Sequence, residues 1–346
     1  MQPERRHFDR VAISVTLPPG SPPDEMKKKT RSKPETHPVL KRRSIPDRPK
    51  GRLSDFKENL FQPVDALPLG AFRFLFGLLQ CIEFFVVSRE TFPADYITPI
   101  FHFTYPLFDL LGLKPLSQSY LWVIFHVLRI SAVGVMLGLF TRLSLLLFTA
   151  SFGYFFFMES AVYTNHYYLI FLLSFLMCFG HSGGQFSLDS LMNKKARREQ
   201  VANWELFLLR FQICVVFFFG ALAKMNTDWL IYAAPLYLNL IKHFSFLGHP
   251  FQEKWVALAL SWGGMLSDLG LGILLFVGRW RRLTFIWLCL FNGINVFFFG
   301  LGIKTFPYLM ISTYILFLPS SILRAWMARF VSGSFAELYR DRIRND

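Results

Sequence analysis

Long apolar runs, separated by short polar or proline-containing segments, follow residue 60 of this chain. They fall at roughly 69–87, 120–139, 143–158, 166–179, 204–223, 256–277, 283–301 and 306–318. A run of about twenty apolar residues can cross the hydrocarbon of a bilayer as one helix. The pattern therefore predicts an all-α fold, a polytopic transmembrane helix bundle of about eight spans.

The segment before these runs has a different character. Residues 1–60 hold 15 Lys and Arg, 8 Asp and Glu, and 9 of the 19 prolines, with almost no apolar periodicity. Such a segment buries too little apolar surface to fold. We therefore expect a disordered basic cytoplasmic tail at 1–59, a transmembrane domain at 60–325 and a short basic cytoplasmic tail at 326–346.

The basic residues test this arrangement independently. If the basic N-terminal tail is inside, alternate spans return to the inside at Arg142, Lys194–Arg198, Arg279–Arg282 and the C-terminal tail from Arg324 onward. Every basic cluster then lies on one side, as the positive-inside rule requires. We expect a multi-pass integral membrane protein with a cytoplasmic N-terminus, in the inner membrane of a bacterium or the endoplasmic reticulum of a eukaryote.

Composition supports the membrane assignment and narrows the partners. Hydrophobic residues make up 53% of the chain and charged residues 17%, well below the roughly 25% of soluble domains. The basic tail suits an anionic membrane surface rather than a nucleic acid, since no base-stacking or groove-reading motif accompanies it. The four cysteines form no CxxC pair, and no HExxH, Walker or GxSxG motif is present. The sequence therefore predicts membrane lipid as a partner, no nucleic acid and no metal.

Lys224 is the most informative position because it ends the run at 204–223 abruptly. One interpretation is snorkelling, in which the aliphatic stem lies along lipid and the ammonium reaches the headgroups. The other is a desolvated amine that is neutral near pH 7 and acts as a base. Taken alone, a lysine at a helix end favours snorkelling.

Other polar groups fall at the same predicted side of the membrane. His166 follows Asn165 at the outer end of a hairpin, and the run at 283–301 holds Asn292 and Asn295. Polar groups within a bundle normally face its interior, so these side chains and Lys224 could line one outward-facing pocket. The nearby phenylalanines at 217–219 and 297–299 would suit a flat apolar ligand. The simpler alternative is a turn asparagine followed by an interfacial histidine.

Two further features of the apolar runs have structural interpretations. Asp268 is either a proton relay or, more simply, the partner of an intramembrane arginine such as Arg129, because an unpaired charge there is costly. The adjacent glycines Gly263 and Gly264 suggest close helix packing.

Seven short segments, taken in order, resemble the membrane domain of vitamin K-dependent γ-glutamyl carboxylase and its bacterial relatives, the HTTM domain family. The similarity covers roughly residues 60–320, and the segments are Phe72–Gly77, Met136–Leu139, Thr164–Leu169, Leu209–Gln212, Ala221–Trp229, Asp268–Leu269 and Phe306–Tyr308.

The resemblance implies a chemistry for the site. In that family the lysine that matches Lys224 deprotonates vitamin K hydroquinone, oxygen adds, and the oxygenated product becomes the epoxide while it removes a proton from a substrate Glu. The carbanion then captures carbon dioxide. The resemblance thus implies Lys224 and His166 as catalytic residues. It implies Asn165, Asn292, Asn295 and Arg73 as substrate- or cofactor-binding residues.

The implied co-substrates are reduced vitamin K, oxygen and carbon dioxide. The implied partners are a quinone and a Glu-containing peptide or a separate subunit. Two departures from the carboxylase pattern weaken the carboxylation half of this scheme. Asn292 stands where the carboxylase has a histidine, and an asparagine side chain has no titratable group. The carboxylase also continues into a large luminal domain beyond the point that matches Asp346. We therefore expect quinol oxygenation more than protein carboxylation; the alternative is a non-catalytic quinone- or lipid-binding protein, or a small-molecule transporter.

Overall fold

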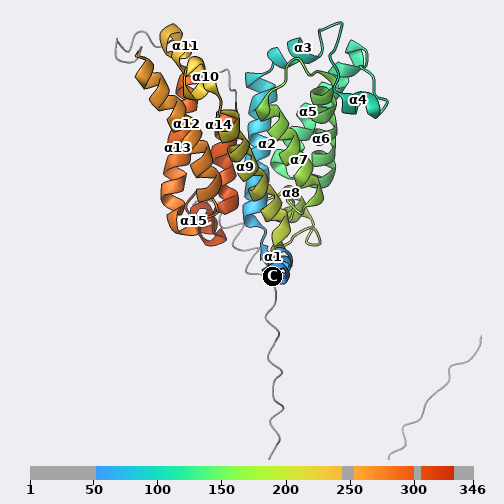
Figure 1. Ribbon diagram of the computed structural model, residues 1–346. Coiled ribbons are helices and arrows are strands. Elements are labelled where there is room, and N and C mark those ends of the chain that lie inside the picture. Colours follow the sequence, from blue (N-terminus) through green and yellow to red (C-terminus); the bar gives the residue numbers. More distant parts are fainter. Residues whose placement is uncertain (1–51, 244–252, 300–304, 331–346) are drawn as a thin grey trace, which may run out of the picture. The chain divides into compact units, whose positions relative to one another are not determined.

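The computed structural model of this protein describes residues 52–243, 253–299 and 305–330 (Figure 1). Residues 1–51, predicted to be disordered, and residues 331–346 of the predicted C-terminal tail lie outside these ranges. Within the described residues the chain is helical, apart from one two-stranded antiparallel sheet of β1 (Pro63–Asp65) and β2 (Gln200–Ala202).

The longer helices follow the apolar runs of the sequence. They are α2 (Leu67–Ile82), which continues as the π-helix η1 (Glu83–Val87), α5 (Gln118–Leu137), α6 (Thr141–Met158), α7 (Asn165–Phe179), α9 (Asn203–Ala223), α12 (Lys254–Leu274) and α13 (Arg281–Phe299). The chain ends with α14 (Phe306–Ser312), the 3-10 helix η6 (Thr313–Phe317) and α15 (Ser320–Phe330). Shorter helices connect them: α1 (Arg52–Phe61), α3 (Thr91–Tyr96), α4 (Pro106–Leu110), α8 (Leu188–Met192), α10 (Thr227–Leu230), α11 (Ala234–His243) and the 3-10 helix η4 (Gly278–Trp280).

The predicted all-α transmembrane bundle is confirmed. Among the described residues, six helices are long and apolar enough to cross a membrane, and a seventh span results if the bent pair Phe306–Phe317 and Ser320–Trp326 is counted as one. The apolar helix α7 is shorter, at 15 residues. The count of eight spans therefore stays a prediction.

The sheet marks one end of the helix bundle, which we call the sheet end. Helices α2 and α9 both begin directly after its strands, so both run away from it. Arg324 of α15 returns the chain to this end, since its Nη2 lies 2.8 Å from Asp65 Oδ2. Figure 1 shows α1 and α15 at this end, and α3 and α11 at the opposite one.

The basic clusters of the described chain gather at the sheet end. Arg142 lies in the first turn of α6, where its Nη2 is 3.5 Å from His181 Nε2. The backbone N–H of Arg198 donates to Gly184 O, and Arg281 O accepts from Tyr314, shortly before α15. Alternation of the helices therefore places these arginines together, as the charge pattern predicts. The side of the membrane on which this end lies stays a prediction.

An aromatic core joins α2, α3, α5, α6 and α7. The Phe92 ring stacks on Phe125 at a centroid distance of 5.3 Å, and Phe148 stacks on Phe152 at 5.9 Å. All four rings are buried to within 1% exposure. Gly77 allows α2 to lie against α5, because a Cβ there would be 2.3 Å from Met136 N. Offset and edge-on ring contacts contribute about 0.5–1.5 kcal/mol each beyond burial of area, so this cluster stabilises the bundle.

Helices α9 and α12 form a second close contact, and glycines again permit it. A Cβ at Gly220 would lie 3.2 Å from Asp268 Oδ2, and one at Gly272 would lie 3.3 Å from Phe217 Cβ. The expectation for Gly263 and Gly264 was wrong, because an added Cβ at either position meets no atom of the described residues within 4 Å.

One boundary differs from that expected. Residues 52–59, placed in a disordered tail, belong to helix α1, and Phe56 packs edge-on against Phe207 of α9 at 5.7 Å.

The last apolar run, expected at 306–318, forms α14 and η6, and α15 follows at an angle of 116° to them. Pro319 follows directly after Leu318 and cannot continue a helix, which accounts for the break.

Asp65 links the sheet to the last helix. Partial burial alone would raise the pKa of this carboxyl, but hydrogen bonds from Arg324 and from the Leu67 N–H outweigh burial and hold the pKa below 3.8. The folded protein therefore binds fewer protons here than the unfolded chain as the pH falls towards and below 3.8. The stability that Asp65 contributes is present above that pH and is lost on further acidification.

We expect Asp65→Asn to reduce the acid sensitivity of folding. Wild-type protein in detergent should lose thermal stability as the pH falls below about 4, since the carboxylate must then be protonated. The variant should lose less over the same range. Asp228→Asn removes an exposed carboxylate and serves as the control. If wild type and Asp65→Asn lose the same thermal stability as the pH falls below about 4, the role of the Asp65–Arg324 contact is contradicted.

The predicted orientation can be tested by labelling. In a cysteine-free background, a cysteine at Tyr232, beyond the end of α9, should react with an impermeant maleimide applied to intact cells. A cysteine at Lys194, at the sheet end, should react only after the membrane is opened. The reverse result would invert the orientation.

Candidate functional site

Lys224 directly follows α9 and is held by a carboxylate. Its Nζ lies 2.5 Å from Asp268 Oδ2 of α12 and donates a second hydrogen bond to Gly220 O at 3.3 Å. The lysine side chain is 22% exposed and the aspartate side chain 8%. The two residues therefore form a largely buried ion pair between antiparallel helices.

An aromatic ring covers the same amine. The Lys224 Nζ lies 5.4 Å from the centroid of the Trp229 ring, within the range of a cation–π contact. Trp229 is fixed from both sides: its N–H donates to the side chain of Asn226, and its carbonyl accepts from Ser261 of α12 at 2.5 Å. The segment after α9 thus folds back over the ion pair.

This geometry corrects one expectation and modifies another. The proposed pairing of Asp268 with Arg129 is wrong, because the partner of Asp268 is Lys224. Snorkelling does not describe Lys224 either, since its ammonium group is bound by Asp268 within the bundle. Any proton transfer at Lys224 involves Asp268 as well, because the two side chains share one hydrogen bond.

The predicted residues Asn165 and His166 lie in the first turn of α7. Asn165 is exposed and His166 half-buried. The His166 ring lies 4.8 Å from the Tyr167 ring and 6.0 Å from Phe306 at the start of α14. Because α7 returns to the sheet end, its first turn lies at the same end of the bundle as Lys224, as expected.

A buried carboxylate beside His166 adds a group that the sequence interpretation did not use. Glu83 is 0% exposed, and its Oε1 accepts from Ser88 at 2.6 Å and from Tyr167 at 3.1 Å. Its Oε2 accepts from the Thr305 hydroxyl at 2.7 Å and from the Thr305 N–H at 3.3 Å. This Glu83 cluster joins η1, α7 and the start of α14. In the sequence, the signal that could have predicted this cluster was an acidic residue, Glu83, within the apolar run at 69–87.

The two asparagines of α13 occupy different environments. Asn292 is 1% exposed, and its side-chain amide donates to Leu288 O of its own helix at 2.9 Å. Asn295 is half-buried one turn further along. Among the described residues, neither asparagine is hydrogen-bonded to Lys224 or His166. Their role in binding stays a prediction.

Arg73 lies towards the sheet end of α2, away from these groups. It is fully buried, and its guanidinium donates to Val135 O at 2.6 Å, Met136 O at 3.1 Å and Phe186 O. Gly138, which ends α5 in the left-handed region at φ 66°, leaves room for it, because a Cβ there would be 2.5 Å from Arg73 Nη1. Arg73 therefore binds the last carbonyl groups of α5 and holds α2 against that helix, which is a structural role.

The predicted residues therefore form separate sets rather than one. Lys224 lies with Asp268 and Trp229, whereas His166 lies with Phe306 and the Glu83 cluster. Of the phenylalanines expected to form an aromatic wall, Phe218 and Phe219 are 50% and 58% exposed, and Phe297 is 54% exposed. Those rings face outward and do not enclose Lys224.

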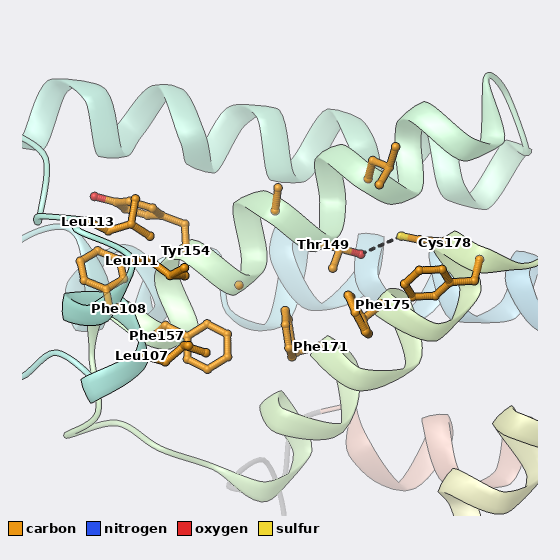
Figure 2. A pocket seen from close by; sticks show the side chains of 14 residues that line it. Leu107, Phe108, Leu111, Leu113, Thr149, Tyr154, Phe157, Phe171, Phe175 and Cys178 are labelled. Carbon is orange, nitrogen blue, oxygen red and sulfur yellow. Dashed lines mark hydrogen bonds between the residues drawn. The ribbon is translucent and has the colours of Figure 1, made fainter.

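An apolar cavity of about 450 Å³ lies elsewhere, between α4, α6 and α7. Figure 2 shows Leu107 and Phe108 of α4 at one end of it, and Thr149 and Cys178, joined at 3.5 Å, towards the other. Phe171 and Phe175 of α7 form one wall. Its volume and apolar lining suit a hydrocarbon chain or an apolar ring.

We expect Glu83→Gln to destabilise the protein by about 3 kcal/mol. Glutamine replaces one carboxylate oxygen by an NH₂ group, which cannot accept the hydrogen bonds that this oxygen accepts in the wild type. Hydrogen bonds to charged groups contribute about 1.5–3 kcal/mol each. The measurement is the unfolding midpoint in detergent. Glu90→Gln, at an exposed glutamate at the same end of the bundle, should leave the midpoint unchanged. Equal midpoints for Glu83→Gln and wild type would show that the cluster contributes little.

Comparison with known proteins gives the family. A family model described as the HTTM domain matches residues 61–321, which is most of the chain. No solved structure matches it. The HTTM domain is associated with the membrane domain of vitamin K-dependent carboxylase, so the resemblance noted in the sequence is confirmed at the level of the family. The chain belongs to the HTTM domain family.

Proposed function

We propose that this protein oxygenates a reduced quinone, such as vitamin K hydroquinone, and that the Lys224–Asp268 pair accepts the proton of the quinol. The observation that carries this proposal is the 2.5 Å contact between Lys224 Nζ and Asp268 Oδ2. Lys224 is the residue that matches the base of the related carboxylase. Intramembrane ionisable groups that are retained at a cost commonly serve a function.

The pair has the capacity to take up one proton. A lysine ammonium bound to a carboxylate has no free lone pair, but the carboxylate can still be protonated. Lys224 can therefore pass a proton to Asp268 while it accepts one from a quinol hydroxyl. A phenolic hydroxyl has a pKa of about 10, so nearby positive charge is needed to favour its ionised form. Lys224 supplies that charge, and the Trp229 ring lies 5.4 Å from its Nζ.

The overall reaction balances without a further reductant. Hydroquinone and oxygen give the quinone epoxide and one molecule of water, so the hydroquinone provides both the electrons and the hydrogens. In a coupled reaction, a Glu γ-carbon would lose a proton and bond carbon dioxide. His166 and Asn165 lie at the same end of the bundle as Lys224, although in a separate set of contacts, and remain proposed site residues. Asn292 donates to Leu288 O of its own helix, and its amide cannot carry a proton.

A second candidate function is the binding of a quinone or lipid without catalysis. The cavity between α4, α6 and α7 favours it, because this cavity is apolar, has a volume of about 450 Å³ and does not include Lys224 or His166 among its lining residues. A small-molecule transporter would also need access to its site from both faces of the membrane. The proposed oxygenation consumes a quinol, whereas binding without catalysis does not.

We expect purified protein, supplied with reduced vitamin K and oxygen, to form the epoxide, and Lys224→Ala to lower the rate about 100-fold or more. A positioned acid or base contributes about 10²–10⁴-fold to such a step. Chromatography of the quinone products measures the rate. Lys254→Ala removes an exposed lysine that contacts Tyr232, and it should keep the full rate.

The Asp268→Asn variant tests whether proton transfer needs both members of the pair or Lys224 alone. If Asp268 is the final proton acceptor, this variant should be as slow as Lys224→Ala, and the double variant should be no slower than either. A normal rate in well-folded Lys224→Ala would remove the lysine from the reaction. Quinol that binds but is never oxidised by wild-type protein would favour the non-catalytic alternative.

A further inference from the structure

The apolar cavity between α4, α6 and α7 is not used by the proposed reaction. It has a volume of about 450 Å³, and neither Lys224 nor Asp268 lines it. Three lining side chains are exposed at the surface of the protein: Leu146 at 56%, Phe175 at 43% and Phe179 at 55%. Because the outer surface of a membrane bundle faces lipid, the cavity is open to the hydrocarbon chains of the bilayer.

The cavity has the length of a lipid acyl chain. On α6 its lining extends from Leu146 to Phe157, and an α-helix rises about 16 Å over that distance. One leaflet contributes about 15 Å, half of the hydrocarbon core of a bilayer. Figure 2 shows the lining side chains along α6 and α7, with Cys178 towards one end and Leu113 towards the other. One acyl chain that lies parallel to α6 therefore fits the cavity.

Arg142 lies at the sheet end of this cavity. It is in the first turn of α6 and precedes Leu146 by four residues, so both side chains are on one side of the helix. Its Nη2 lies 3.5 Å from Nε2 of His181, which follows the lining residue Phe179 by two positions. The guanidinium therefore joins the ends of α6 and α7, the helices that carry most of the lining. Since Arg142 begins a membrane span, it lies at the level of the lipid headgroups.

The charge of Arg142 is available to an anion, because no carboxylate of the described residues forms an ion pair with it. Glu205 binds His181 instead: its Oε1 lies 2.9 Å from Nδ1 of His181, and its Oε2 accepts from the His181 N–H at 2.6 Å. Asp189 accepts from the Thr141 N–H and hydroxyl, each at 2.7 Å. When Nδ1 of His181 donates to Glu205, Nε2 is left as an acceptor that orients Arg142.

We propose that this cavity binds one acyl chain of an anionic glycerophospholipid and that Arg142 binds the phosphate of the same lipid. A guanidinium has five N–H donors, so two parallel ones remain for the phosphate when one faces His181. The basic clusters of the sheet end attract anionic lipid to the same leaflet. The proposal holds whether or not the protein oxygenates a quinol, since the cavity does not include the Lys224–Asp268 pair.

Native mass spectrometry of the protein purified in detergent measures the binding of phosphatidylglycerol directly, without any quinol. Arg142→Gln should weaken binding about tenfold, because the charge-assisted hydrogen bonds to the phosphate are lost. Ala150→Phe places a ring in the cavity at an exposed position and should also weaken binding about tenfold, because part of the chain loses its burial. Diacylglycerol with the same chains should bind to wild-type protein as weakly as phosphatidylglycerol binds to Arg142→Gln.

Two further variants serve as matched controls. Arg279→Gln removes an exposed arginine of η4, an element that does not line the cavity. Lys114→Gln removes an exposed cation next to the lining residue Leu113, at the other end of the cavity. Both should bind phosphatidylglycerol as wild type does. An equal loss in Arg279→Gln would reduce the site to general charge attraction, and a loss in Lys114→Gln alone would move the headgroup to the other leaflet; either overturns the proposal.

The remaining outcomes test each half of the site. Unchanged binding in Ala150→Phe would place the chain outside the cavity, and equal binding of diacylglycerol would remove the phosphate from recognition. Displacement of phosphatidylglycerol by an equal concentration of vitamin K quinone would assign the cavity to a quinone instead. Each of these results overturns the proposal. Gel filtration checks that each variant is folded. If Arg142→Gln does not fold, Arg142→Lys decides, with weakened binding expected from loss of the planar fork and unchanged binding contradicting the site.

Discussion

A charge inside a bilayer must be compensated there, and the ion pair of Lys224 and Asp268 meets this constraint by joining the end of α9 to α12. The bond fixes α9 against α12 at the level of Gly220, where a larger residue would meet the carboxylate. It also decides which chemistry the lysine can perform. A lysine held by a carboxylate transfers protons together with its partner and not as an isolated amine.

The other buried charges satisfy the same constraint in different ways. Arg73 donates to the carbonyls of Val135 and Met136 in the last turn of α5, and so anchors α2 near the sheet end. Glu83 accepts from hydroxyls and a backbone N–H, and so ties η1 to α7 and α14. Arg129 lies against aromatic rings instead, with its Cζ 4.0 Å from the centroid of the Phe85 ring.

The sequence predicted the helices well, because apolar runs and basic loops are local signals. It also predicted that Lys224 and His166 share one end of the bundle. It could not predict the partner of Asp268, since the pairing joins residues 44 apart and Arg129 was an equally plausible cation. The Glu83 cluster was missed for the same reason, because Thr305 is 222 residues away. Glycine spacing misled as well: Gly220, and not the pair Gly263–Gly264, lies at the contact.

The π-helix η1 sets the length of chain between Glu83 and Ser88. A π turn holds one residue more than an α turn, and here the Ser88 N–H returns to Glu83 O at 2.7 Å while its hydroxyl reaches the same residue's carboxylate. Removing one residue from this turn would leave an α turn and would shift the Ser88 hydroxyl relative to the Glu83 carboxylate, which it now reaches at 2.6 Å. The segment therefore tolerates changes of side chain at its exposed positions but not changes of length.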